Sequence, residues 1–215
     1  MGIPHRLAAE YPTRCLQLLA AAEPQARERN LVGSFALLVA ASVLTIPFER
    51  ARAKHFLHRE RDDRMTVMIS ELNKVMFVDA PFWNGAKPVG WRQSHIVQNF
   101  DAPDDWVGRD GKHPFANGAQ DFLSDKTAAS VLRVLRNALS HGNIVYLNEA
   151  GQEREGDPLH YLAFLSRYEE GEEQQERSET YRLIVATEDE FLRFIRLWAE
   201  WIAQKAIDDK AMVAA

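Results

Sequence analysis

Apolar side chains recur at helical spacing along most of the chain, and this pattern predicts a succession of helices. Pro12 and Pro24 are each suited to the first turn of a helix, where proline's missing N–H is not needed. We therefore expect a short helix from Pro12 through Leu19 and a second segment from Pro24 to Leu44, after which Ile46-Pro47 bends the chain. The later helices are expected over Asp63 to Met76, from after Ser124 to His141, and from Thr187 to about Ile207.

The helix ends carry their own signals. Gly142 stands directly after His141, where a glycine commonly ends a helix. Thr187-Glu188-Asp189-Glu190 has the spacing of a capping box, with threonine as N-cap and glutamate three residues later. The third helix carries an apolar stripe that is more typical of a core-facing side than of a binding surface, formed by Met65, Met68, Ile69, Leu72 and Val75 or Met76.

Strand-like runs follow His141. Residues 144–147 form a short run, and residues 160–168 and 181–186 flank the acidic stretch Glu169–Glu176 as a hairpin would. Residues 78–117 are rich in Pro, Gly, Asn and Trp, which predicts an irregular excursion with at most short helical pieces such as 92–100. We expect its tryptophans Trp83, Trp91 and Trp106 to anchor the excursion to the core, in preference to forming a binding platform.

The length of 215 residues and the hydrophobic fraction of 46% suit one domain with a sizeable core. We therefore predict a single, mainly α domain over residues 1–215. It is a helical bundle with an irregular excursion at 78–117 and an antiparallel insertion of a hairpin or three strands at 143–187, before the last helix.

Three further features of the sequence indicate the compartment in which the protein is found. The longest apolar run, Leu31 to Pro47, falls short of the roughly 20 residues that cross a bilayer, and we expect a buried core helix. The N-terminus lacks the leading apolar stretch of a signal peptide. Cys15 is the one cysteine and stands among leucines, which favours a buried apolar role and a reducing compartment. Cytoplasmic localisation without a membrane partner is the expectation.

Charge is unevenly distributed along the chain. Residues 1–148 hold 18 Lys and Arg against 15 Asp and Glu, whereas residues 149–215 hold 8 against 16. The net charge of −5 therefore comes from the C-terminal part and does not exclude a polyanionic ligand elsewhere.

The helix that ends at His141 gathers its polar groups opposite its apolar side. At 100° per residue, the side chains of Leu132, Leu135 and Leu139 lie on one face. The other face is expected to carry Arg133, Arg136, Asn137, Ser140 and His141.

These residue types suit RNA cleavage without a metal. An imidazole can take a proton from a ribose 2′-hydroxyl or give one to the leaving oxygen. A guanidinium can hold phosphoryl oxygens as charge develops. His141, Arg136 and Asn137 are therefore the catalytic candidates, and Arg133 and Ser140 the substrate-binding ones. Arginine and histidine five residues apart are also common on ordinary helix surfaces, so the spacing alone leaves a purely structural role open.

The stretch Arg136-Asn137-Ala138-Leu139-Ser140-His141-Gly142-Asn143 resembles the signature of the HEPN superfamily, in which arginine and a polar residue, often asparagine, precede a histidine. In that family the motif lies in a late helix of a helical bundle. The predicted helix order is compatible with this layout over roughly two thirds of the chain. The excursion and the strands after His141 depart from a minimal bundle.

The resemblance implies a metal-independent endoribonuclease of the toxin or phage-defence kind, whose paired motifs form one cleft across a homodimer. It implies that His141 acts as general acid and base, Arg136 as phosphate clamp and Asn137 as orienting residue. The partners that the resemblance implies are RNA and a second copy of the chain, and an antitoxin protein where the role is that of a toxin; no cofactor is expected. Other HEPN proteins are non-catalytic modules that bind RNA, a nucleotide or a protein, and this alternative stays open.

Three other features have less specific patterns. His55 and His58 with Glu60 offer no convincing third metal ligand, so we expect a solvated basic stretch and no metal. The basic residues of 50–64 can bind along an RNA backbone, or they can form an exposed helix surface in which they pair with neighbouring acidic residues. We favour the exposed helix surface. The acidic stretch Glu169–Glu176 is expected to be a solvated hairpin tip. The balance of 4 basic against 13 acidic residues over 149–190 leaves open that this stretch docks a basic partner.

Overall fold

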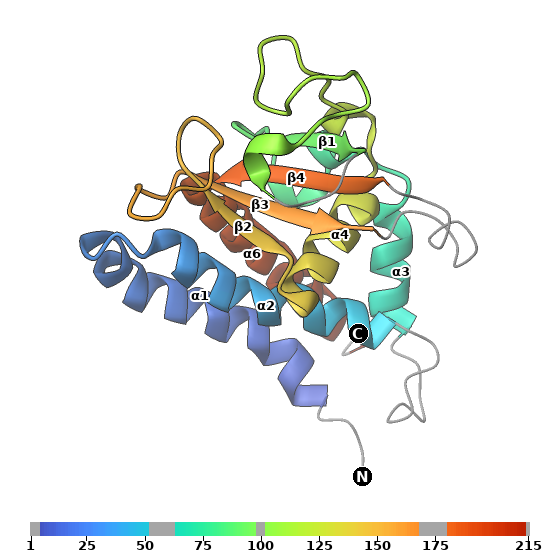
Figure 1. The fold of residues 1–215 in the computed structure, drawn as a ribbon. Coiled ribbons are helices and arrows are strands. Elements are labelled where there is room, and N and C mark those ends of the chain that lie inside the picture. Colours follow the sequence, from blue (N-terminus) through green and yellow to red (C-terminus); the bar gives the residue numbers. More distant parts are fainter. Residues whose placement is uncertain (1–4, 52–62, 98–101, 168–179, 214–215) are drawn as a thin grey trace.

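A four-stranded antiparallel sheet forms the middle of the fold, with helices packed on one face and irregular segments on the other (Figure 1). The structure is a computed structural model and describes residues 5–51, 63–97, 102–167 and 180–213. Its helices within this part are α1 (His5–Glu28), α2 (Val32–Ala51), α3 (Asp63–Leu72), α4 (Ala128–His141) and α6 (Glu188–Val213). The mainly helical class is confirmed.

α1 continues through Pro12 and Pro24, so the prediction that these prolines open two separate helices is wrong. Proline usually interrupts a helix because it lacks an N–H and crowds the carbonyl four residues earlier. Here α1 packs along both α2 and α6, and Glu23 accepts a hydrogen bond from Arg196 of α6. The helix breaks instead before α2, where Asn30 adopts a φ of 54°. Tertiary packing has overridden the local signal.

The next two helices agree with the pattern except at their ends. α2 confirms the buried core helix, but it runs past Pro47 to Ala51 and does not stop at Leu44. α3 begins at Asp63 as predicted and ends at Leu72, before Met76. Its stripe is confirmed as core at Met68 and Leu72, whereas Met76 is exposed; the side chains of Met65 and Ile69 lie outside the description.

α6 begins with half of the predicted capping box. The side-chain oxygen of Thr187 accepts a hydrogen bond from the backbone N–H of Glu190 at 3.3 Å, as an N-cap does. The Glu190 carboxylate does not complete the box; it accepts from Arg193 at 2.7 Å and from the backbone N–H of Val89 at 3.2 Å. The start of the last helix is thereby tied to the excursion, and the helix extends to Val213, beyond Ile207.

The sheet has the strand order β1-β4-β3-β2. Its members β2 (Ile144–Leu147), β3 (Tyr161–Ser166) and β4 (Tyr181–Thr187) confirm the three predicted strands, with β3 and β4 paired antiparallel. The acidic stretch Glu169–Glu176 between them lies outside the described residues.

A fourth strand, β1 (Arg92–Ile96), was missed by the sequence pattern. The short helical piece expected at 92–100 is wrong, because this segment pairs antiparallel with β4, from Arg92 opposite Val185 to Ile96 opposite Tyr181. The insertion is therefore a four-stranded sheet to which the excursion contributes an edge strand. The pattern gave no sign of it because Gln93, Ser94 and His95 are polar and yet buried, so no alternation of apolar and polar residues remains.

The main core lies between the sheet and the helices. Seven aromatic side chains meet there, and neighbouring rings have centroids 5.3–6.5 Å apart. They are Phe77, Phe82, Trp83, Trp91, Phe191, Phe194 and Trp198. The indole N–H groups of Trp83 and Trp198 donate to the backbone oxygens of Phe77 and Val43. These bonds satisfy the indole nitrogens of Trp83 and Trp198 inside the core, whereas the buried indole nitrogen of Trp91 has no hydrogen-bond partner within the described part of the chain.

A smaller core covers the opposite face of the sheet. Trp106 from the excursion packs there with Ile96, Leu147 and Leu183, and Phe115 lies against its margin. Trp83, Trp91 and Trp106 are 1%, 6% and 3% exposed. The prediction that these tryptophans anchor the excursion is confirmed.

Cys15 is buried in the main core, as predicted, and burial raises the pKa of its thiol. Within the described residues, no helix is both long and apolar enough to span a membrane.

We predict that the stability of the main core depends strongly on Phe77. This side chain is fully buried, and its ring lies 5.3–5.4 Å from those of Trp83 and Trp91. Phe77→Ala should lower the free energy of unfolding by about 3–5 kcal/mol, because it leaves a cavity. Phe77→Leu keeps most of the volume and should cost less than about 2 kcal/mol. Urea unfolding followed by circular dichroism measures both, and equal losses for the two variants would contradict this packing.

Candidate functional site

α4 is held at both ends by the residues that the sequence marks. The Thr127 hydroxyl accepts a hydrogen bond from the backbone N–H of Ser130 at 3.3 Å and caps the first turn. At the other end Gly142 has a φ of 71°, and its N–H donates to the Ala138 carbonyl. A left-handed residue at this place costs glycine little and ends the helix sharply. The chain then turns into β2, which leaves His141 at the tip of the helix.

The apolar face of α4 is buried as predicted. It lies against α2 on one side and β3 on the other. Its buried members are Ala128, Ala129, Val131, Leu132, Val134, Leu135 and Ala138. Arg133, Ser140 and His141 are exposed, and Arg136 is half-buried at the border between the two regions.

Asn137 differs from the expectation for the polar face. Its side chain is only 7% exposed, and its amide nitrogen donates to the Ser166 hydroxyl at 3.3 Å. The helix has two covered flanks and not one, because the end of β3 lies over the side that was expected to face solvent. The Asn137 amide is thus engaged beneath the surface and does not stand free beside His141.

The structure adds polar groups that the sequence did not single out. His95, Arg182 and Ser166 stand directly opposite one another on β1, β4 and β3, so their side chains point from the same face of the sheet toward α4. We call these three residues the polar row. Arg182 donates to the Ser130 hydroxyl of α4 at 2.8 Å, and Ser166 accepts from Asn137.

Burial of polar residues is concentrated at this place. Among the described residues, the buried polar and charged ones are Gln93, Ser94, His95, Asn137, Ser166 and Arg182. All except Ser94, which points to the other face, lie on α4 or on the face of the sheet that packs against α4. Buried polar residues are costly to keep in a core and are often retained at functional sites.

The electrostatic environment of the polar row is cationic. Burial, followed by the nearby charge of Arg133, lowers the pKa of Arg182 to about 10. Burial also lowers the pKa of His95 to about 4, and the charges of Arg109, Lys126 and Arg182 act in the same direction. His95 is therefore a neutral imidazole at neutral pH, lying edge-on to Phe122 at 5.0 Å.

A sequence signal for the row existed but was weak. Arg182 is a charged residue at the start of an otherwise apolar strand, and His95 and Gln93 are polar residues beside the buried Trp91. In the sequence alone these residues do not indicate a common site. Only the strand register shows that His95 lies opposite Arg182.

Metal binding finds no support in the described part of the chain, which contains no cluster of three or more His, Cys, Asp or Glu placed to hold an ion. His55, His58 and Glu60, and most of the basic stretch around them, lie outside the described residues.

The family of the chain is given by its similarity to known proteins. A family model described as HEPN pEK499 p136 matches residues 1–209. The chain belongs to this HEPN family. No curated protein and no solved structure matches it. The match spans nearly the whole chain, so the sheet and the excursion are part of the family's domain and not an addition to it. HEPN domains are commonly nucleases or RNA-binding modules.

We predict that His95 makes stability depend on pH in the acidic range. The imidazole is neutral in the folded protein down to a pKa of about 4, whereas in the unfolded chain it takes a proton near its ordinary pKa of 6.5. The unfolded state thus binds more protons between these values, and stability should fall as the pH falls from about 6.5 to about 4. The loss from this one group is at most about 3 kcal/mol.

Comparing the wild type with His95→Gln isolates this contribution from those of the other titrating groups. Chemical unfolding at a series of pH values should show a flatter profile for His95→Gln between pH 6.5 and 4. Parallel profiles for the two proteins would mean that the buried imidazole is not the group that titrates.

Proposed function

We propose that this HEPN protein is a metal-independent endoribonuclease in which His141 and Arg136 carry the chemistry. The observation that carries the proposal is the position of His141, exposed at the tip of α4, five residues after a half-buried arginine. An imidazole at a helix end is reachable by a ligand. The half-buried position of Arg136 restricts the freedom of its side chain. The family of the chain supports RNA as the ligand.

The reaction follows from what each group can do. A neutral His141 imidazole takes the proton of a ribose 2′-hydroxyl, and the 2′-oxygen attacks the adjacent phosphorus. The bond from phosphorus to the 5′-oxygen breaks, and this oxygen takes a proton from an imidazolium. Arg136 holds the phosphoryl oxygens while negative charge builds on them. The products are a 2′,3′-cyclic phosphate and a 5′-hydroxyl.

Helix geometry favours a site made by two copies of the chain. Residues five apart on a helix are separated by about 140° around its axis and about 7.5 Å along it. Arg136 and His141 of one helix therefore point in different directions. A second copy that meets the first at this end of α4 supplies the second imidazole and the second guanidinium that the reaction needs. The homodimer follows as part of the proposal.

The remaining motif residues have supporting roles. Arg133 and Ser140 are exposed on the same helix and are available to bind the RNA backbone. Asn137 bonds to Ser166 from a buried position, so we assign it to positioning the end of α4 and not to touching the phosphate. A toxin or phage-defence role, with an antitoxin partner, is a further part of this hypothesis.

A non-catalytic RNA-binding module is the second candidate. The burial of Asn137 favours it, because one of the three groups of the motif is used inside the fold. In this alternative Arg133 and Arg136 of α4 still bind the RNA backbone, and no proton is transferred.

We predict that purified protein cleaves single-stranded RNA in the presence of EDTA and that His141→Ala lowers the rate by about 100-fold or more, as expected for loss of a general acid–base group. Gel analysis of labelled RNA and mass spectrometry of the products measure rate and end groups. The control is Ser140→Ala, which removes the neighbouring exposed hydroxyl and should lose far less. Cleavage that needs a metal, or that His141→Ala retains, would contradict the mechanism.

The predicted dimer is tested separately. Light scattering coupled to size exclusion should give about twice the chain mass of 24.5 kDa at micromolar concentration. A monomer at that concentration would remove the second imidazole and leave the binding-module hypothesis in place.

A further inference from the structure

The polar row is accompanied by a fully buried amide. Gln93 precedes His95 by two residues and points from the same face of β1 toward the helices. Its side chain is 0% exposed, and within the described part of the chain neither its nitrogen nor its oxygen has a hydrogen-bond partner. A buried amide without partners costs on the order of 1–3 kcal/mol unless a ligand or water satisfies it. This place therefore has unused hydrogen-bonding capacity.

Two exposed arginines stand at the margin of the same place. Arg133 lies on α4 close enough to Arg182 for its charge to act there. Arg109 follows the bridge between Gly108 and Ile96, and its backbone N–H donates to the His95 carbonyl. Neither arginine forms an ion pair with any residue of the described part of the chain. We call Arg109 and Arg133 the cationic rim.

We propose that the polar row and the cationic rim form a phosphate-binding subsite, distinct from the Arg136–His141 end of α4, that holds a second phosphate of the bound RNA. Arg182, the Ser166 hydroxyl, the neutral His95 imidazole and the Gln93 amide nitrogen are all able to donate hydrogen bonds to phosphoryl oxygens. The inference rests on the proposed function in taking RNA as the ligand, but it does not require cleavage.

The charge environment agrees with an anionic ligand. The net effect of the surroundings on Arg182 and on His95 is to disfavour their charged forms. An anion placed among these groups reverses that balance, because an opposite charge nearby favours the cation. A phosphate therefore gains more here than at an exposed arginine that is already screened by water.

The subsite lies along the same helix as the proposed cleavage centre. Arg133 precedes Arg136 by three residues, which is about 4.5 Å along the axis. An RNA strand that follows this side of α4 passes the cationic rim before it reaches His141. The subsite thus holds the strand upstream or downstream of the scissile phosphate and keeps that phosphate at the helix tip.

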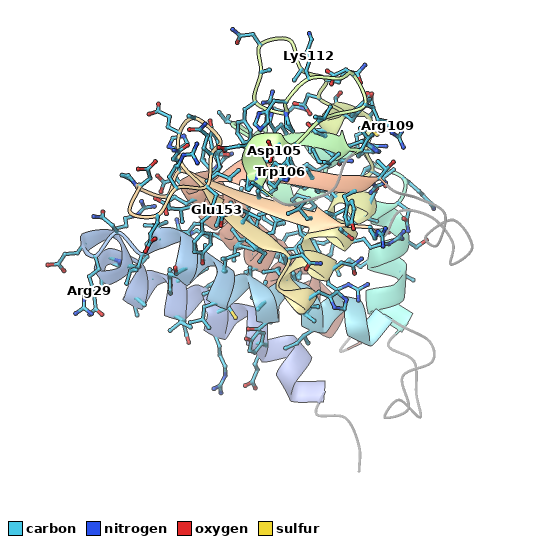
Figure 2. The ribbon with its side chains drawn as sticks, in the orientation of Figure 1. Arg29, Asp105, Trp106, Arg109, Lys112 and Glu153 are labelled. Atoms are coloured by element: carbon cyan, nitrogen blue, oxygen red, sulfur yellow. The ribbon has the colours of Figure 1, made fainter. Side chains whose placement is uncertain are left out.

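A matched pair of exposed arginines tests the proposal without disturbing the core. Figure 2 shows Arg109 beside the β1 end of the sheet and Arg29 at the distant turn between α1 and α2. Both are exposed, so Arg109→Gln and Arg29→Gln each remove one positive charge without emptying a buried site. Binding of fluorescein-labelled single-stranded RNA is measured by anisotropy over a potassium chloride series, in a full-length His141→Ala background that prevents cleavage.

Arg109→Gln and Arg133→Gln should each weaken binding by about threefold to tenfold and lower the salt slope by about 0.7 for each phosphate that is no longer neutralised. Arg29→Gln should leave both quantities at the level of the parent. Arg182→Gln is the deeper variant and should show a larger loss, provided that circular dichroism shows it to be folded. If it is not folded, the comparison of Arg109 with Arg29 decides. Equal behaviour of Arg109→Gln and Arg29→Gln would overturn the subsite.

Two further outcomes separate the ligand and the function. If inorganic phosphate raises the melting temperature of the parent but not of Arg109→Gln, while RNA binding is the same for both, the assignment to RNA is overturned in favour of a small phosphate ligand. If wild type fails to cleave RNA but Arg109→Gln still weakens RNA binding, the nuclease proposal fails and the subsite stands. If wild type cleaves RNA and neither rim variant weakens binding, the subsite fails and the nuclease proposal stands.

Discussion

The burial of α4 between α2 and the sheet is the contact on which the rest of the candidate site depends. Seven apolar side chains of this helix are buried there. Full burial of a valine or leucine contributes about 1.5–3 kcal/mol each, so the helix has little freedom to rotate. Its rotation decides which groups reach the surface: Arg133, Ser140 and His141 do so, and Asn137 does not. The chemistry available to the protein is thus set by apolar packing on the opposite side of the same helix.

The flank of α4 that meets the strands is stabilised in a different way. Ser130 bonds to Arg182, and Asn137 bonds to Ser166, so two polar contacts join the helix to neighbouring strands. Such buried bonds demand correct geometry, because an unmade one leaves the full desolvation cost in place. They fix the helix to one register on the sheet. The bond to Ser130 also holds the guanidinium of Arg182 in a buried position between the sheet and α4.

The sequence predicted those parts of the fold in which one local pattern decides the outcome. α4, with its threonine cap, its apolar face and its terminal glycine, follows from residues within one stretch, and so do β3, β4 and the start of α6. The sequence-based prediction was wrong where contacts with residues far away in the chain determine the local structure. Pro12 stays inside α1 because α2 and α6 pack beside it, and β1 is a strand because β4 accepts it as a partner. The motif was predictable for the same reason as α4, whereas the polar row became visible only with the register of three strands.

The sheet has a more specific role than that of extending a helical bundle. A bundle can place side chains beside α4 only at helical spacing, whereas antiparallel strands set His95, Arg182 and Ser166 in a line across three chain segments. Trp106 and its neighbours cover the other face of the same strands. The excursion and the strands therefore have one physical consequence in common. Together they bring fixed polar groups to the side of α4, next to a motif whose own helix cannot supply them.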